Sequence, residues 1–336
     1  QMKSRIFIPL AIAALIIAGM VCMRLSKKET DKSVEEKHDS VAKIESAKKT
    51  KQYTVKPSAV PLPDIVPAPI ISVAGREIDI PGSMNVVMGQ DDNSGYAARV
   101  KAVHRLGKHL TSEEIDALYV LMDRKSSEDK LSLPQMAALK NEVANILRRQ
   151  EKNPVDLARN FIAMYRDERH DEVWRDYCIQ HLGAWYKEIS GDENRRQAVD
   201  TIWLAANEKK SATAGTALLA FFYNIDRPGI DRVEVSAKAL ELAGDSDCSE
   251  SARITALQIC AELGDMGALS IARKIASSSA GVPLRMSAIA AIGTLGDQSD
   301  RPLLEKYASS GDVRLRKSAS SALERLAGRR TPGSGD

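Results

Sequence analysis

The chain has 336 residues, 43% of them hydrophobic, which is enough for two ordinary domains or one extended array with a buried core. Lys and Arg exceed Asp and Glu by only three, 48 against 45, so there is no overall positive field and nucleic acid is excluded as the default partner. The four cysteines form no CxxC motif and no Cys/His pair at metal-ligand spacing, so we expect no metal and no cofactor.

The first predicted element is an apolar run over residues 6–23 that contains no charged residue. Basic residues flank it on both sides, so the distribution of positive charge leaves its orientation open. The run is just long enough to span a membrane, and residues 1–28 are predicted to be a signal anchor with a single N-terminal helix. The alternatives are a signal peptide that is cleaved on export to the periplasm or outside, or lipid attachment at Cys22, although neither has a good small-residue cleavage site.

Residues 29–91 are predicted to be a linker. Its first half mixes Lys with Glu and Asp and has no sustained apolar period, which is typical of a disordered stalk. Five prolines between residues 57 and 69 then favour an extended, semi-rigid spacer, or alternatively a ligand for SH3-type domains. Pro81-Gly82 and the stretch 90–95 carry turn residues, so we expect the folded array to begin after them, at residue 92.

From residue 92 onward one pattern recurs. An Arg is followed at +3 by a small residue, at +4 and +7 by apolar residues and often at +8 by Gly, which predicts an amphipathic helix that a glycine ends. Frames that fit begin at Arg99, Lys140, Arg175, Ala214, Arg253, Arg285 and Arg316. Helical units repeated every 31 to 41 residues predict a solenoid of stacked helix pairs. Cys178 and Cys260 fall in equivalent helices and are expected to be small buried residues without a disulfide.

The stretches Ala252–Asp265, Leu284–Asp297 and Asp312–Leu323 carry this pattern most clearly, and they resemble the HEAT family, in particular its short repeats of the phycobilisome-lyase type. The resemblance covers residues 92–328 and leaves 329–336 as a flexible tail. It implies an all-α fold, an alpha-alpha superhelix of the armadillo type. It also implies a scaffold that binds other proteins.

The resemblance further implies a ladder in which an Asp in the turn and an Arg at the start of the second helix link adjacent repeats. Its members would be Asp171, Arg175, Asp247, Arg253, Arg285, Asp312 and Arg316. Arg285 departs from the pattern because no Asp lies in the turn before it. The alternative is a row of arginines that binds phosphates or carboxylates.

Ten of the fifteen aromatic residues lie between residues 161 and 223. Trp and Tyr are the side chains that most often anchor protein interfaces, so this cluster is the predicted partner-binding site. Its residues are Trp174, Tyr177, Trp185, Tyr186 and Trp203. The alternative is that the rings fill an irregular junction between repeats.

No catalytic constellation can be assembled, and the histidines, His170 among them, are isolated in the sequence. The sequence therefore predicts a membrane-tethered or exported scaffold, not an enzyme, that holds a protein or peptide on its concave face. One alternative is a lyase-like enzyme subunit that binds a small molecule. Another is a binder of anionic polymers, nucleic acid or lipid, through a basic last repeat that contains Arg314, Lys317 and Arg325.

Overall fold

The computed structural model describes residues 82–91 and 94–328. The predicted anchor, the linker as far as residue 81 and the tail therefore lie outside the described residues. Within them every regular element is helical and no strand occurs. None of these helices combines the length and apolar character that crossing a membrane requires.

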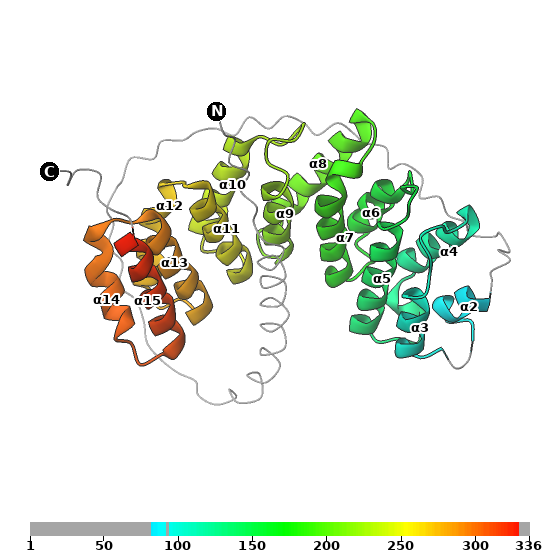
Figure 1. Cartoon of the computed structure of the whole chain (residues 1–336), viewed down its shortest axis with the longest axis horizontal. Helices are drawn as coiled ribbons and strands as arrows, with labels where there is room; N and C mark the ends of the chain where they lie inside the picture. Colours follow the sequence, from blue (N-terminus) through cyan, green and yellow to red (C-terminus); the bar gives the residue numbers. More distant parts are fainter. Residues whose placement is uncertain (1–81, 92–93, 329–336) are drawn as a thin grey trace, which may run out of the picture. The chain divides into compact units, whose positions relative to one another are not determined.

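The described helices form seven consecutive pairs, which Figure 1 shows one after another. The first helices are α2 (Gly82–Met88), α4 (Ser112–Asp123), α6 (Leu157–Arg166), α8 (Asp192–Ala206), α10 (Arg232–Gly244), α12 (Gly267–Ala276) and α14 (Arg301–Ala308). The second helices are α3 (Tyr96–Val103), α5 (Leu133–Leu147), α7 (Glu172–Trp185), α9 (Thr213–Phe222), α11 (Glu250–Leu263), α13 (Val282–Leu295) and α15 (Val313–Gly328). Short 3-10 turns are η1 (Ser126–Glu128), η2 (Tyr186–Glu188) and η3 (Gln298–Asp300).

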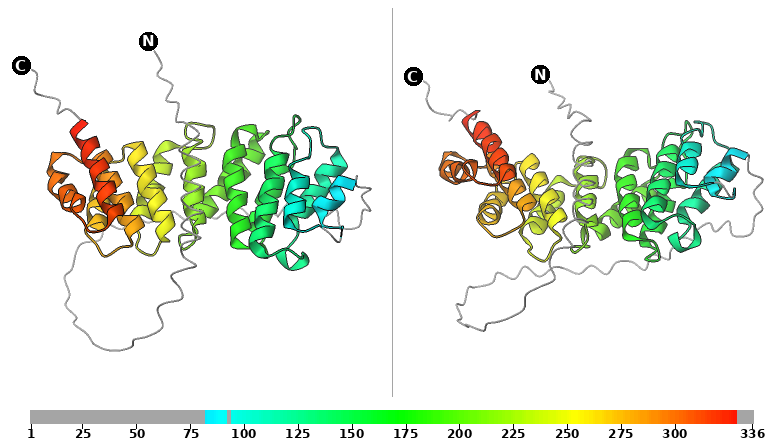
Figure 2. Two further views of the ribbon diagram at one scale, coloured as in Figure 1. Left: turned by 60° about the horizontal axis from the view of Figure 1, so that its bottom comes forward. Right: turned by 90° about the horizontal axis from the view of Figure 1, so that it is seen from below.

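Each second helix packs against the second helix of the next pair, from α3 through to α15. The two further views in Figure 2 show the same succession. All seven frames found in the sequence lie in second helices, so the predicted all-α array of stacked helix pairs is confirmed. No helix pair can bury its apolar side alone, because that side is covered by the neighbouring pairs.

The small residue at +3 of each frame is the centre of these contacts. In six of the seven frames the residue at +3 is fully buried, and Ala102 in the first frame is 8% exposed. Small side chains here let neighbouring second helices approach closely. Cys178 and Cys260 occupy this stripe as buried free thiols, as predicted.

The glycine at +8 has a different role from the predicted one. Gly183 and Gly293 lie inside α7 and α13 and do not end them. A Cβ on Gly183 would lie 2.4 Å from the Cβ of Ala220 in α9, and a Cβ on Gly293 would lie 2.6 Å from that of Ala322 in α15. The prediction that these glycines stop the helices was wrong, since they allow close contact between neighbouring second helices.

The array also begins earlier than predicted. Helix α2 lies inside the stretch assigned to the linker, yet Met84 and Val87 are fully buried in the core. The Arg99 side chain donates a hydrogen bond to the Val87 carbonyl at 2.9 Å and ties α2 to α3. Residue 92 was therefore too late a boundary, because a seven-residue helix after five prolines gives little periodic signal.

The buried apolar residues fall into two clusters that meet at α9. The first extends from α2 to Val235 at the start of α10, and the second extends from α9 to α15. Within α9, Phe221 belongs to the first cluster and Leu218 to the second. We call these clusters the first core and the second core.

Candidate functional site

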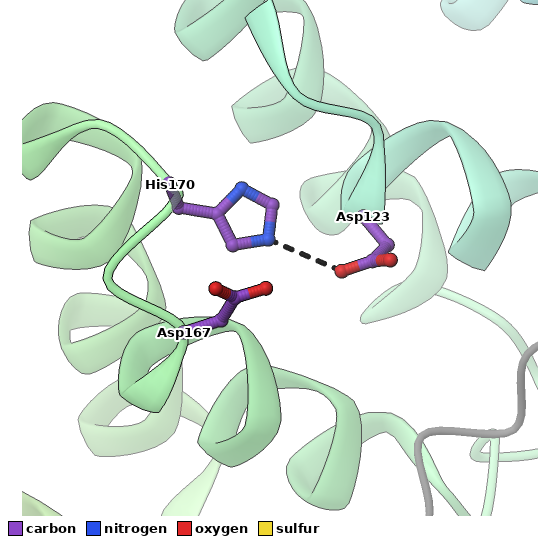
Figure 3. Close-up of side chains that lie close together, drawn as sticks. All are labelled: Asp123, Asp167 and His170. Carbon is purple, nitrogen blue, oxygen red and sulfur yellow. Dashed lines mark hydrogen bonds and ion pairs between the residues drawn. The ribbon is translucent and has the colours of Figure 1, made fainter.

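A cluster of polar side chains lies where the second and third pairs meet. Asp123 is the last residue of α4, Asp167 follows α6, and His170 lies in the turn before α7. One ligand atom from each lies within 4.8 Å of the others, a spacing that suits a metal ion. Figure 3 shows the three side chains directed toward one another. His170 is isolated in the sequence, so its grouping with Asp123 and Asp167 could not be predicted from spacing.

Lys125 occupies the centre of this cluster. Its Nζ lies 3.1 Å from Asp123 Oδ1, 2.9 Å from Asp167 Oδ2 and 2.8 Å from His170 Nε2. An ammonium group in this position takes the place that a divalent cation would need and compensates the same carboxylates. The cluster with Lys125 in place therefore does not fit a metal, and it acts as an ion-pair brace between two pairs.

The protonation states support this interpretation. The His170 side chain has no exposed area, and burial lowers its pKa, so the imidazole is neutral. Its Nε2 lies 2.8 Å from Lys125 Nζ and 3.1 Å from Asp123 Oδ1, so it either accepts a hydrogen bond from the ammonium or donates one to the carboxylate, while Nδ1 has no hydrogen-bond partner within the described residues. Burial raises the pKa of Asp123, but contacts with His170 and Lys125 outweigh it and lower that pKa. A buried imidazole without an exposed edge cannot transfer a proton to a bound substrate.

The four arginines of the predicted ladder make a different contact. Arg175 donates to the Tyr165 carbonyl at 2.7 Å, and Arg253 donates to the Ala243 carbonyl at 3.3 Å. Arg285 and Arg316 donate in the same way to Ala276 at 3.3 Å and Ser310 at 2.6 Å. The acceptors lie at or just beyond the C-terminal ends of first helices, where backbone carbonyls lack partners. These four contacts join the two helices of one pair. Arg175 also pairs with Glu208 after α8, and the Arg285 guanidinium lies 5.2 Å from the centre of the Tyr307 ring in α14, so these two arginines do link adjacent pairs, although not through the predicted Asp residues.

The predicted ladder acids are not the main links between pairs either. Asp171 caps α7 by accepting a hydrogen bond from the Trp174 backbone N–H at 3.0 Å. Asp312 binds Arg314, with its Oδ2 2.9 Å from the guanidinium. Asp247 is exposed, and the N-cap of α11 is Ser249. Capping the start of a helix satisfies its free N–H groups, and that role does not need a partner in the next repeat.

A ladder of ion pairs between helix pairs does exist, and of the predicted residues it includes Arg175. Besides Lys125 and Asp167, it contains Arg175–Glu208 at 2.9 Å, Lys209–Asp245 at 3.0 Å and Arg273–Asp300 at 2.6 Å. Asp167 and Asp245 each lie eight residues before the Arg of their frame, at the C-terminus of a first helix. That shared position is the sequence signal that would have identified them.

Three of the five predicted partner-binding aromatics lie in the first core. Trp174 is fully buried, and Trp185 and Tyr186 are 5% and 2% exposed. A residue with so little surface cannot act as an interface anchor, so the prediction is corrected for this group, whose rings fill the junction between pairs. Tyr177 and Trp203 are half-buried against the same core, and their role in binding stays a prediction.

Tyr186 nevertheless marks a cavity of about 300 Å³ at the fourth pair. The cavity is lined by Tyr186, Asp192, Arg195, Arg196, Val199, Pro228 and Gly229. The Tyr186 hydroxyl donates a hydrogen bond to the Pro228 carbonyl at 2.5 Å, which fixes the loop after α9 against η2. Gly229 has φ +83°, and a Cβ there would lie 3.4 Å from the Tyr186 hydroxyl, so this wall of the cavity favours glycine.

Among the described residues, the ion pairs of both arginines of the cavity are with neighbours on α8. Arg195 pairs with Asp192 at 3.0 Å, and Arg196 pairs with Glu193. Burial raises the pKa of the Tyr186 hydroxyl, while the charges of Arg195 and Arg227 act against that rise, which places positive charge beside the cavity. Apart from Tyr186, which belongs to the predicted aromatic site, the lining residues could not be predicted because they come from separate segments with no common period.

A family model of HEAT repeats matches residues 237–324, from α10 to α15. No curated protein matches the chain. Among solved structures, human deoxyhypusine hydroxylase in complex with glycerol is 16% identical over 74% of this chain and 97% of its own, with a TM-score of 0.30. An engineered protein is 15% identical over 74% of this chain and 98% of its own, with a TM-score of 0.22. Both TM-scores are too low to support a statement about function.

Proposed function

Since residues 237–324 of this chain are HEAT repeats, we propose that the protein is a non-catalytic scaffold that binds a segment of a protein partner. The finer assignment to the phycobilisome-lyase type stays a prediction. The observation that carries the proposal is the cavity at the fourth pair. Its volume is at the lower end of the roughly 300 to 1,000 Å³ typical of ligand sites.

The walls of this cavity are suited to binding. Tyr186 is buried and hydrogen-bonded to Pro228, so one wall is held rigidly by the first core. Val199 contributes an aliphatic surface, and Arg196 extends into solvent with 69% of its side chain exposed. A rigid apolar wall beside a mobile charged group resembles the buried anchor and polar rim of a protein interface. The predicted partner site thus moves from the aromatic surface of the array to this cavity.

The proposal also includes tethering. The charge-free run over residues 6–23 supports a membrane anchor, and the segment that follows would act as a stalk. A random coil as long as residues 29–91 reaches roughly 45 Å from the membrane. Protease added to intact cells should digest the array if it lies outside. A retained anchor should leave a membrane-bound stump, and a cleaved anchor should leave none. Complete resistance in intact cells together with sensitivity after lysis would contradict an external array.

Affinity capture tests the binding proposal. The full chain, purified in detergent, should retain a reproducible partner from a lysate of its own cells. Arg196→Glu and Val199→Asp should each reduce the amount captured at least fivefold, because one reverses the charge at the rim and the other places an unpaired charge in the cavity wall.

Arg301→Glu is the matched control, since Arg301 is a half-exposed arginine in an ion pair within α14, far along the chain from the cavity. It should leave capture unchanged. Equal capture by wild type and both cavity variants would contradict a partner site at the fourth pair.

A further inference from the structure

Resting on the proposed function, we propose that the cavity takes an acidic segment of the partner, with a Glu or Asp carboxylate bound by Arg195 and Arg196. A neighbouring aliphatic side chain of that segment packs on Val199 and Pro228. The proposal specifies the chemistry of the partner, which the proposed function leaves open.

The two arginines of the cavity have unused hydrogen-bonding capacity. Within the described residues each guanidinium donates one hydrogen bond, Arg195 to Asp192 and Arg196 to Glu193. A guanidinium has five N–H groups, arranged so that two can bind both oxygens of one carboxylate. Both side chains therefore have donors left for an acceptor that arrives from outside.

The ion pairs of Arg195 with Asp192 and of Arg196 with Glu193 are weak. The Asp192 side chain is fully exposed, and the Glu193 side chain is 56% exposed. Pairs of this kind, three residues apart on a solvated helix, contribute little to stability. A carboxylate that binds both guanidinium groups at once therefore has little to displace, and it can accept two parallel hydrogen bonds from one guanidinium.

The charges in and beside the cavity favour an anionic ligand. In and beside the cavity, Asp192 and Glu193 carry two negative charges, and Arg195, Arg196 and Arg227 carry three positive charges. One positive charge is therefore uncompensated. A carboxylate would neutralise that charge.

The apolar part of the cavity lies close to the arginines. Val199 is one helical turn after Arg195 on α8, and Pro228 faces it from the loop after α9. Gly229 adds no side chain to this wall, which leaves room for the methyl groups of a Val, Leu or Ile. An acidic residue next to an aliphatic one fits both halves of the cavity.

Selection from a random dodecapeptide library on the immobilised full chain provides the test, with the library itself as the probe. Selected peptides should be enriched in Asp or Glu beside Leu, Ile or Val. Their affinity should fall at least tenfold for the Arg195→Glu/Arg196→Glu variant and stay within twofold for Arg301→Glu. Thermal unfolding followed by circular dichroism checks that the variants are folded.

Peptides without enrichment in acidic residues, or peptides that bind the double variant as well as wild type, would overturn the acidic assignment. The result also separates the two proposals. If such peptides still lose binding to Val199→Asp, the cavity is a partner site of different chemistry. If no selected peptide depends on Val199, the proposed function itself fails.

Discussion

Lys140 is a buried cation without a hydrogen-bond acceptor in the described part of the chain. Its Nζ lies 5.2 Å from the centre of the Trp174 ring, and burial lowers its pKa from 10.5 to about 8. Below pH 8 the ammonium is protonated in both the folded and the unfolded chain, so the folded state carries the whole penalty of a buried charge. The penalty disappears as pH rises from 8 to 10.5, and it amounts to about 3 kcal/mol at neutral pH.

We therefore expect Lys140→Met to raise the free energy of unfolding at pH 7 by about 1 to 3 kcal/mol, with a smaller gain at pH 10. Lys238→Met is the matched control. Lys238 is also buried, but its Nζ bonds Asn207 at 2.7 Å and Glu241 at 3.0 Å, so its loss should destabilise the array by about 1 kcal/mol. Urea unfolding at several pH values measures both. A Lys140→Met protein that is less stable than wild type at pH 7 would contradict this account of the buried amine.

Lys125 gives a second expectation at this scale. In wild type its ammonium fills the space between Asp123, Asp167 and His170. Lys125→Ala should leave two carboxylates and an imidazole close together, which is a ligand set for a transition metal. Cobalt(II) should then give a d–d absorption band with the variant and none with wild type. The variant should also lose about 1 kcal/mol of stability without metal, since two partly buried carboxylates lose their cation. A band of equal strength in wild type would show that Lys125 does not hold the site.

Gly183 shows how one residue sets the distance between two elements. The Cβ that Gly183→Ala adds would lie 2.4 Å from the Cβ of Ala220, so the substitution forces α7 and α9 apart. We expect a loss of about 1 to 3 kcal/mol in the free energy of unfolding. Gly328→Ala is the control, because a Cβ there meets nothing within 4 Å, and it should be neutral or slightly stabilising. Equal stability of the two variants would mean that the helix contact adjusts without cost.

At the scale of helices, the sequence predicted much of what the structure contains. The +3, +4 and +7 stripe located all seven second helices, because a buried helical face repeats with the helical period. The role of Gly183 could not be predicted, because it depends on Ala220 in another pair. The position of Asp167 eight residues before Arg175 marks it in the sequence, but its partner Lys125 could not be predicted, because Lys125 belongs to another pair. The cavity joins Tyr186, α8 and Pro228, which share no period.

Across the whole array, the two cores that meet at α9 should differ in how they respond to mutation. All three tryptophans belong to the first core or pack against it. Tryptophan fluorescence therefore reports on the first core, while circular dichroism at 222 nm reports on all helices. In a repeat array, stability is transmitted through contacts between neighbours, so the two signals can separate.

Ile292→Ala in α13 removes a fully buried side chain of the second core, at a cost of about 3 kcal/mol. We expect it to move part of the circular dichroism transition to lower urea while the fluorescence midpoint changes little. Ile202→Ala in α8 instead removes a buried side chain of the first core, and it should shift the fluorescence midpoint. If Ile292→Ala shifts both signals equally, the array unfolds as one unit.

We propose that the partner binds at the fourth pair, and hydrogen exchange of the full chain with and without its captured partner tests this most directly. We predict slower amide exchange at residues 186–199 and 229–230, with little change in α13 and α15. Protection confined to α13 and α15, or no protection around Tyr186 and Arg195, would contradict it.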